Sequence, residues 1–281
     1  MTTFAIAGRL TVNRLGYGTG QLTGFGYWGE RLPPEDAVAV LRRAVERGAT
    51  LIDTADNYGP GLAEELVARA LHPYGDGLVL ATKGGVLRTG PNVWHIDGRP
   101  ASLRARCEAS LRRLRVETVD LYQLHRIDPE VPLVDQLGTL AELRTEGKIR
   151  HIGLDTVTPE ELAEAMTITE IASVQNRYNL LDRDSEPVLE LCEARGLAFL
   201  PWFPLGNGKL AAAAEGSPLA EVAARHGATP NQVALAWLLH RSPVLLPTPG
   251  TGSLAHLEEN MDAAALRLTG QDMEALAGAA A

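Results

Sequence analysis

Residues 34–53 read PEDAVAVLRRAVERGATLID and predict a helix followed directly by a strand. Pro34 is suited to the first helical turn and Gly48 to the helix end, while apolar side chains recur between them at three- and four-residue spacing. The short apolar run Thr50–Asp53 has the length of a buried strand. The apolar helix residues at this spacing are Val38, Leu41 and Val45. This pattern predicts a helix that packs on a sheet and leads into its next strand.

The same alternation of short apolar runs and amphipathic stretches continues along the chain. The predicted strands are Asn13–Gly18, Thr50–Asp53, Leu78–Thr82, Asp120–Leu124, Ile149–Gly153, Ser173–Gln175, Ala198–Trp202 and Val244–Leu246. Alternating strands and helices indicate a parallel sheet covered by helices. About eight units favour a closed (β/α)₈ TIM barrel, with an open doubly wound sheet as the alternative. A short β-hairpin, Thr3–Ala7 with Leu10–Val12, is predicted before the repeat.

Composition and charge narrow the class of protein. The 281 residues include 26 basic and 35 acidic side chains, so the formal net charge is −9. This charge argues against nucleic-acid binding, and no apolar run approaches the roughly 20 residues that span a bilayer. The N-terminal residues lack the pattern of a secretory signal, and Cys107 and Cys192 suit reduced, buried thiols. We therefore expect a cytoplasmic protein with one domain over residues 1–281.

The glycine-rich stretch Gly16–Gly24 does not match a Rossmann fingerprint. A G-x-G-x-x-G motif beginning at Gly16 would need glycine where Gln21 stands, and one beginning at Gly18 would need it where Thr23 stands. The stretch is instead interpreted as a strand end that continues into a flexible loop.

Four titratable residues follow predicted strands at the same end. Asp53, Lys83 and His125 lie at the ends of the second, third and fourth strands, and Tyr58 lies on the loop after the second. In a barrel of this type, functional residues gather at the carboxyl ends of the strands. Each residue alone also suits a structural role: a turn cap, a packed aromatic, a solvated lysine or a hydrogen-bonded histidine. Their common position favours an active site.

The four residue types fit proton donation to a carbonyl group. A tyrosine hydroxyl has a pKa near 10, and we expect a neighbouring lysine ammonium to lower it. An aspartate can hold the lysine charged, and a histidine can donate a hydrogen bond to the carbonyl oxygen. The set therefore indicates reduction of a carbonyl that receives a hydride.

Several motifs in the same order resemble the aldo-keto reductase family, and its bacterial members most of all. They are Ile52–Gly59 (IDTADNYG), Ala81–Gly84 (ATKG), Val119–His125 (VDLYQLH), Gly147–Gly153 (GKIRHIG), Val174–Asn179 (VQNRYN) and Leu257–Asn260 (LEEN). The resemblance covers nearly the whole chain. It implies that Asp53, Tyr58, Lys83 and His125 form the catalytic tetrad, with Tyr58 as the proton donor.

The resemblance also implies a nicotinamide cofactor, NADP(H), bound in extended form across the top of the barrel. Gln175 would contact the nicotinamide carboxamide, Trp202 would stack on the nicotinamide, and Leu205 and Asn207 would flank the pyrophosphate. The complete set of cofactor contacts implied is Gly18, Thr19, Asp53, Asp155, Gln175, Trp202, Leu205, Asn207, Thr251, Glu259 and Asn260.

Two positions depart from the family pattern. Many members carry Ser-Asn after the fifth strand, where this chain has Asp155 and Thr156. The family often places Lys or Arg after the eighth strand to bind the adenosine 2′-phosphate, whereas this chain offers Thr251 and then His256. The preference between NADPH and NADH is therefore left open by the sequence.

The loops after the strands supply a predicted substrate pocket formed by Phe25, Trp28, Trp94 and Arg126. The two tryptophans are alternatively loop anchors, and Arg126 is equally suited to an anionic substrate or to a neighbouring loop. The predicted partner is a small-molecule carbonyl compound, with pyridoxal and secondary-metabolite carbonyls both open. The oligomeric state is also open.

Two other function classes compete with the reductase. One is a non-catalytic, cofactor-binding scaffold or regulatory protein on the same fold, such as a potassium-channel β-subunit. The other is a metal-dependent barrel hydrolase, which needs several His and Asp or Glu ligands at strand ends. Asp53, His125 and the less suited Asp155 are the candidates for such a set, and no metal site is predicted.

Overall fold

The N-terminal hairpin lies across the amino ends of the barrel strands. The structure, a computed structural model, describes residues 2–206, 208, 210 and 216–278. β1 (Thr3–Ile6) pairs antiparallel with β2 (Leu10–Asn13), as predicted. Their buried side chains Ile6 and Val12 pack into one apolar cluster with residues from the barrel strands. The cluster includes the strand residues Leu51, Val79, Leu121 and Ala198, and also Leu246 from the segment that closes the ring.

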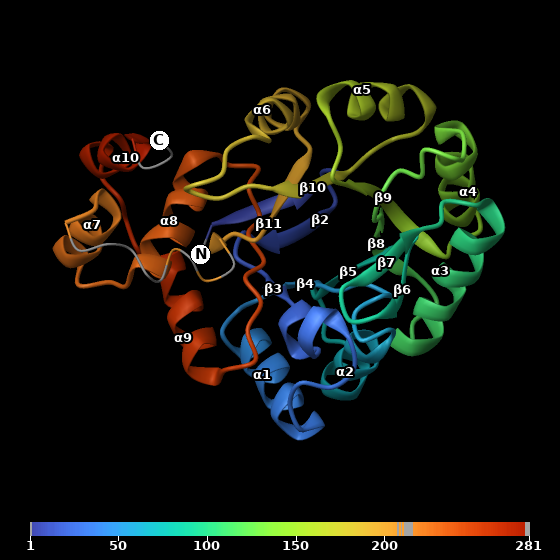
Figure 1. Cartoon of the computed structure of the whole chain (residues 1–281), viewed down its shortest axis with the longest axis horizontal. Coiled ribbons are helices and arrows are strands. Elements are labelled where there is room, and N and C mark those ends of the chain that lie inside the picture. The colour runs from blue at the N-terminus through green and yellow to red at the C-terminus, as the bar shows by residue number, and fades with distance from the viewer. Residues whose placement is uncertain (1, 207, 209, 211–215, 279–281) are drawn as a thin grey trace.

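Seven strands form one parallel sheet in the order β3-β4-β5-β8-β9-β10-β11 (Figure 1). They are β3 (Tyr17–Gly18), β4 (Leu51–Asp53), β5 (Val79–Gly84), β8 (Val119–Leu124), β9 (Ile149–Asp155), β10 (Ser173–Arg177) and β11 (Ala198–Trp202). Residues 244–248 bridge the two edge strands: the N–H of Leu246 donates to Phe199 O at 2.8 Å, and that of Gly16 donates to Pro247 O at 3.0 Å. The ring of strands closes through this segment, which confirms the predicted (β/α)₈ barrel.

The helices surround the strands in Figure 1 and bury their apolar faces against the sheet. Their bounds are α1 (Pro34–Glu46), α2 (Leu62–Leu71), α3 (Pro100–Leu114), α4 (Leu133–Thr145), α5 (Pro159–Ile168), α6 (Glu186–Arg195), α7 (Pro218–His226), α8 (Pro230–Arg241), α9 (Leu254–Asp262) and α10 (Gly270–Ala277). Capping boxes begin α5 at Thr158 and α8 at Thr229. In the described part of the chain, no helix is both long and apolar enough to cross a membrane.

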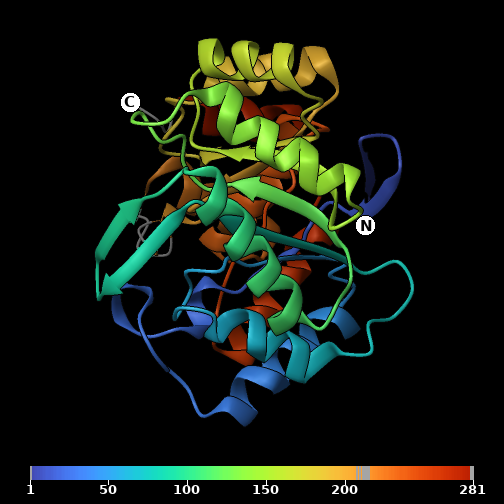
Figure 2. The ribbon, with the colours of Figure 1, turned by 90° about the vertical axis from the view of Figure 1, so that its right-hand side faces the viewer.

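Three regions differ from the sequence prediction. The predicted eighth strand Val244–Leu246 forms only an isolated parallel bridge, between Leu245 and Phe199 of β11. The predicted first strand Asn13–Gly18 is divided, because Asn13 ends β2 and β3 contains only Tyr17–Gly18. After β5 the chain forms an unpredicted antiparallel hairpin, β6 (Val86–Gly90) with β7 (Val93–Ile96), which projects from the barrel at the left of Figure 2. The four residues of β7 are all exposed, so no alternation of buried and exposed positions marks it as a strand.

Candidate active site

Neighbouring strands bring the predicted catalytic residues to one rim of the barrel. Asp53 is the last residue of β4, Lys83 is the penultimate residue of β5, and His125 directly follows β8. Because β4, β5 and β8 are adjacent and parallel, their carboxyl ends meet at the same edge. The backbone N–H of His125 also donates to Gly84 O at 2.9 Å, which extends the β5–β8 ladder to the histidine itself.

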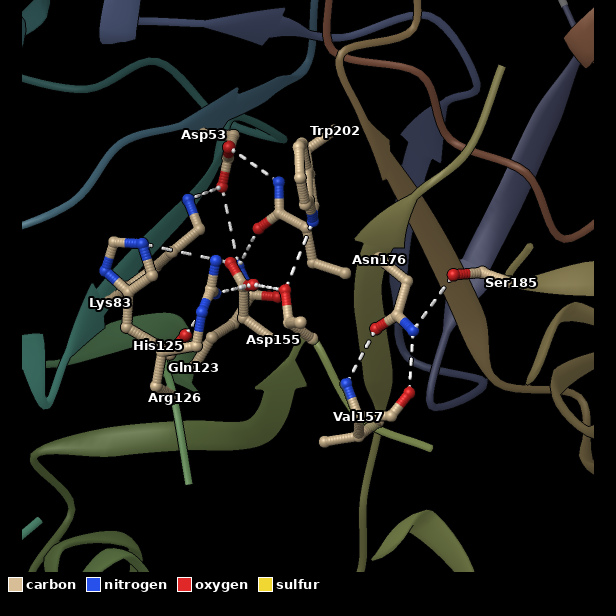
Figure 3. Close-up of polar contacts among 12 residues, drawn as sticks. Asp53, Lys83, Gln123, His125, Arg126, Asp155, Val157, Asn176, Ser185 and Trp202 are labelled. Carbon is tan, nitrogen blue, oxygen red and sulfur yellow. Dashed lines mark hydrogen bonds and ion pairs between the residues drawn. The ribbon is translucent and has the colours of Figure 1, made fainter. Parts of the chain in front are cut away.

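A buried ion pair forms the base of this site (Figure 3). Lys83 Nζ donates to Asp53 Oδ1 at 2.7 Å and to Thr54 O at 2.9 Å. The second carboxylate oxygen of Asp53 accepts from Gln175 Nε2 at 3.1 Å. The Gln175 oxygen in turn accepts from Gln123 Nε2 at 3.0 Å. These bonds supply the partners that a desolvated charge pair requires, and they fix the position of the Lys83 ammonium.

Tyr58 lies beside this pair, enclosed by other rings. Lys83 Nζ lies 5.4 Å from the centroid of the Tyr58 ring. The Tyr27 ring stacks on it with a centroid distance of 5.2 Å, and the His125 ring meets it edge-on at 6.2 Å. Burial, followed by the charge of Asp53, raises the pKa of Tyr58 well above its ordinary value, while Arg88 acts to lower it. This direction is opposite to the lowering expected from the sequence, because burial and the charge of Asp53 outweigh the opposing charge of Arg88. Tyr58 is therefore protonated at neutral pH.

His125 is a neutral histidine in this environment. Burial lowers its pKa well below the ordinary value, and the charges of Lys83, Arg126 and Arg88 lower it further. Its Nδ1 is buried without a hydrogen-bond partner in the described part of the protein. Since a neutral imidazole carries one N–H donor, His125 can present a donor to a ligand without being charged.

Arg126 pairs with Asp155, at the end of the neighbouring strand β9. Arg126 Nη1 donates to Asp155 Oδ1 and, at 2.6 Å, to the carbonyl oxygen of His125. Thr156 Oγ1 donates to the same Asp155 oxygen at 2.7 Å, and the other carboxylate oxygen is 3.9 Å from His125 Nε2. Asp155, which the resemblance implies as a cofactor contact, thus already binds Arg126 and Thr156 through one of its carboxylate oxygens.

A cavity of about 900 Å³ opens over these residues. Its lining includes the predicted site residues Gly18, Asp53, Tyr58, Trp94, His125, Arg126, Asp155, Gln175, Trp202, Leu205, Thr251 and Asn260. A volume of this size is typical of a site for a cofactor or a drug-sized ligand. The convergence of buried titratable groups in this cavity identifies it as the candidate active site.

Comparison with known proteins assigns the family. The sequence profile described as the Aldo/keto reductase family matches residues 14–281. The chain belongs to the aldo/keto reductase family. This confirms the resemblance inferred from the motifs, and the protein is accordingly an NAD(P)H-dependent oxidoreductase.

Among curated relatives, an uncharacterized oxidoreductase of Schizosaccharomyces pombe is 48% identical over 264 residues, covering 94% of this chain and 85% of that protein. Pyridoxine 4-dehydrogenase of Escherichia coli is 41% identical over 280 residues, covering 96% of both. A solved Klebsiella pneumoniae aldo/keto reductase in complex with NADP and acetate superposes with a TM-score of 0.83 at 29% identity, covering 98% of this chain and 93% of that one.

Some residues predicted for the aldo/keto reductase site lie outside the cavity lining. Thr19 is buried and donates to Thr54 Oγ1 at 2.8 Å, so it joins two strand ends. The Glu259 carboxylate accepts from Thr229 Oγ1 at 2.5 Å, at the N-terminal cap of α8. Phe25 and Trp28 are 83% and 37% exposed, and neither lines the cavity, in contrast to the predicted pocket. Asn207 lies outside the described residues.

Other lining residues were not predicted from the sequence. Arg88 and Asn92 come from the β6–β7 hairpin, and Asn231 comes from the first turn of α8. Arg31 lies in the loop before α1 and donates to Gln21 Oε1 at 2.6 Å. The sequence signal for the hairpin was weak, because its turn residue Asn92, at a φ of 57°, is followed by an exposed strand.

Proposed function

We propose that the protein reduces an aldehyde or ketone to an alcohol with NADPH, and that Tyr58 is the proton donor. The observation that carries this proposal is the arrangement of Tyr58 beside the buried Lys83–Asp53 pair, with neutral His125 edge-on to its ring. The family assignment and the solved relative in complex with NADP support the same activity.

The residues along the cavity fit a nicotinamide dinucleotide. Gly18 and Gly250 line the cavity where two backbone segments pack closely: a Cβ on Gly18 would lie 2.6 Å from Thr248 O, and one on Gly250 would lie 2.7 Å from Gly18 O, so neither position has room for a side chain. Asn231 Oδ1 is a buried acceptor without a partner among the described residues. Arg31 adds a cation to the same lining. An unused amide oxygen and a cation in the lining can bind polar and phosphate groups of an extended dinucleotide.

Gln175 and Trp202 are placed to hold the nicotinamide end. The amide of Gln175 bonds Asp53 through nitrogen and Gln123 through oxygen, which fixes its plane and leaves one N–H and one lone pair for a ligand. Trp202 donates from Nε1 to Thr156 Oγ1 at 3.3 Å, which orients its indole at the cavity wall. These contacts support the roles inferred from the resemblance.

The chain's own residues can complete the reaction as follows. When bound, a reduced nicotinamide supplies the hydride that is added to the carbonyl carbon. His125 donates a hydrogen bond to the carbonyl oxygen and orients it. Tyr58 then transfers its phenolic proton to that oxygen, which becomes the alcohol hydroxyl. Lys83 stabilises the resulting phenolate, and Asp53 holds the ammonium charged.

The raised pKa of Tyr58 is compatible with this role. A phenol that stays protonated in the free enzyme is a ready proton donor, and the oxygen of an alkoxide is much more basic than a phenolate. The proton therefore leaves Tyr58 only as negative charge develops on the substrate oxygen. This couples proton transfer to hydride addition.

The test is Tyr58→Phe, with Tyr74→Phe as the matched control because Tyr74 also loses only a hydroxyl and does not line the cavity. We expect carbonyl-dependent oxidation of NADPH to fall about 100-fold or more in Tyr58→Phe, with binding of NADPH retained. Full activity of this variant would contradict the mechanism. Pyridoxal belongs in the aldehyde panel, since one relative is named for oxidation of pyridoxine. NADPH binding without activity on any carbonyl would favour the non-catalytic scaffold.

A further inference from the structure

Among the described residues, Arg88 has no counter-ion, whereas the other charged groups near Tyr58 are paired. Lys83 pairs with Asp53, and Arg126 pairs with Asp155. Arg88 lines the same cavity, and no described carboxylate lies within ion-pair distance of it. Within the described part of the chain, Arg88 therefore adds a positive charge to this wall that no carboxylate balances.

The surroundings of Arg88 make this charge costly. Its guanidinium carbon is 4.8 Å from the ring centroid of Tyr27, and Nη1 donates to Gly26 O at 3.2 Å. Its Nε is buried and has no hydrogen-bond partner in the described part of the chain. A half-buried guanidinium with unused donors is stabilised most by a carboxylate or a phosphate, whose paired oxygens match its planar fork.

Arg88 is also close to the reacting groups. Tyr27 contacts both Arg88 and Tyr58, so a single ring connects the guanidinium to the proton donor. The charge of Arg88 acts to lower the pKa values of both Tyr58 and His125, which indicates that it lies within electrostatic reach of both. A ligand with its carbonyl at Tyr58 would have the guanidinium beside it.

The hairpin β6–β7 sets this position. Arg88 and Trp94 are cross-strand partners in the hairpin, and the Trp94 ring is 5.9 Å from the guanidinium carbon of Arg126. The hairpin thus adds a cation and an aromatic wall to the strand ends, and Arg126 is already engaged by Asp155. Arg88 is the arginine of this wall that remains available for an anionic ligand.

We propose that the preferred substrates are carbonyl compounds that carry an anionic oxygen group, carboxylate or phosphate, and that Arg88 binds this group while the carbonyl lies at Tyr58. This rests on the proposed reductase function and adds the substrate class. Arg88 would act as a specificity residue, with no part in the transfer of hydride or proton.

Two matched substrate pairs test this. The carboxylate pair is 4-carboxybenzaldehyde and its methyl ester, and the phosphate pair is pyridoxal 5′-phosphate and pyridoxal. The measured quantity is the ratio of kcat/KM between the anionic and the uncharged member of each pair. We expect the wild type to prefer the anionic member of at least one pair. We also expect Arg88→Met to reduce that preference by about tenfold or more, and Arg88→Lys by less.

Control variants show whether a preference for anionic substrates comes from Arg88 or from another arginine. Arg267→Met removes the same charge from an exposed position outside the cavity and should keep the preference. A wild type without preference in either pair, or a preference that Arg88→Met retains, would overturn the proposal. A preference for the anionic member that is lost in Arg126→Met but kept in Arg88→Met would also overturn the proposal. If neither member of any pair is reduced, calorimetric binding of the anionic members to wild type and Arg88→Met decides the present proposal. The proposed function itself fails only if no other carbonyl compound is reduced either. Arg88→Lys, which keeps the charge, provides the comparison if Arg88→Met does not fold.

Discussion

The Lys83 ammonium and the Asp53 carboxylate meet at 2.7 Å, with only 1% and 6% of their side chains exposed. Asp53 also accepts a hydrogen bond from Gln175, which lines the cavity. The buried pair thereby connects the interior of the barrel to the surface where a substrate would bind. Its contributions to stability and to activity can be separated by experiment.

Lys83→Met should destabilise the protein by about 3–5 kcal/mol, because it leaves the Asp53 carboxylate buried without its cation. The double variant Lys83→Met/Asp53→Asn should regain part of this loss, since no unpaired charge remains. Urea unfolding of the wild type, the two single variants and the double variant measures the coupling. Activity should stay low in all three variants. Losses of stability that simply add in the double variant would contradict a paired arrangement.

The rate of carbonyl reduction should be nearly independent of pH between about pH 6 and 9. The pKa of His125 lies well below its ordinary range, so the imidazole stays neutral over this interval. The pKa of Tyr58 lies well above its ordinary range, so the phenol stays protonated. Profiles of kcat/KM for reduction check this, with alcohol oxidation, which needs the phenolate, expected to rise with pH. An inflection near pH 6.5 in reduction, abolished by His125→Gln, would contradict a neutral histidine.

The free energy of unfolding should fall as pH rises, because the buried carboxyl of Asp56 loses its proton. Burial raises the pKa of this carboxyl to about 7, although Arg106, at 2.7 Å, opposes the rise. An unfolded aspartate has a pKa of about 3.9, so the folded state binds the proton more tightly. The stabilisation is fully present below about pH 4 and is lost as pH rises through about 7.

Asp56→Asn should remove this component. The measurement is the free energy of unfolding of wild type and Asp56→Asn at pH 5 and at pH 8. The quantity compared is the change between the two pH values in each protein. We expect the wild type to lose more stability between the two values than the variant does. An equal loss in both proteins would show that Asp56 does not titrate in this range.

Arg31 should contribute to the preference for NADPH over NADH. It donates to Gln21, and both residues line the cavity together with Thr251 and His256. We expect Arg31→Met to weaken the binding of NADPH by about tenfold and that of NADH much less, since one arginine–phosphate contact is lost. Quenching of tryptophan fluorescence measures both affinities. Binding of 2′,5′-ADP and 5′-AMP provides the control without a nicotinamide. Equal weakening of NADPH and NADH binding would show that Arg31 does not contact the adenosine 2′-phosphate.

The order of strands and helices could be predicted because it depends on local patterns. A buried parallel strand needs a short apolar run, and a covering helix needs an apolar face at a period of 3.6 residues. The sequence therefore placed Asp53, Lys83 and His125 at the ends of successive strands. The parallel topology then requires their side chains to meet at one rim, which the structure contains.

The rest of the site depends on contacts between residues far apart in the chain. The sequence did not reveal that the carboxylate of Glu259, a predicted cofactor contact, accepts a hydrogen bond from Thr229, 30 residues earlier. The exposed hairpin β6–β7 brings Arg88 to the cavity without any periodic signal in its sequence. The direction of the pKa shift of Tyr58 likewise follows from burial and from the summed charges around it, which spacing alone does not give.

The sequence by itself determined the barrel and the four residues at its rim, because burial of one strand or helix face is decided within a few neighbouring residues. The tertiary structure decided which charges are paired, because pairing depends on distances between different loops. Asp155 forms an ion pair with Arg126, whereas Arg88 forms no ion pair with a carboxylate in the described part of the chain. That difference in pairing carries the inference about an anionic substrate.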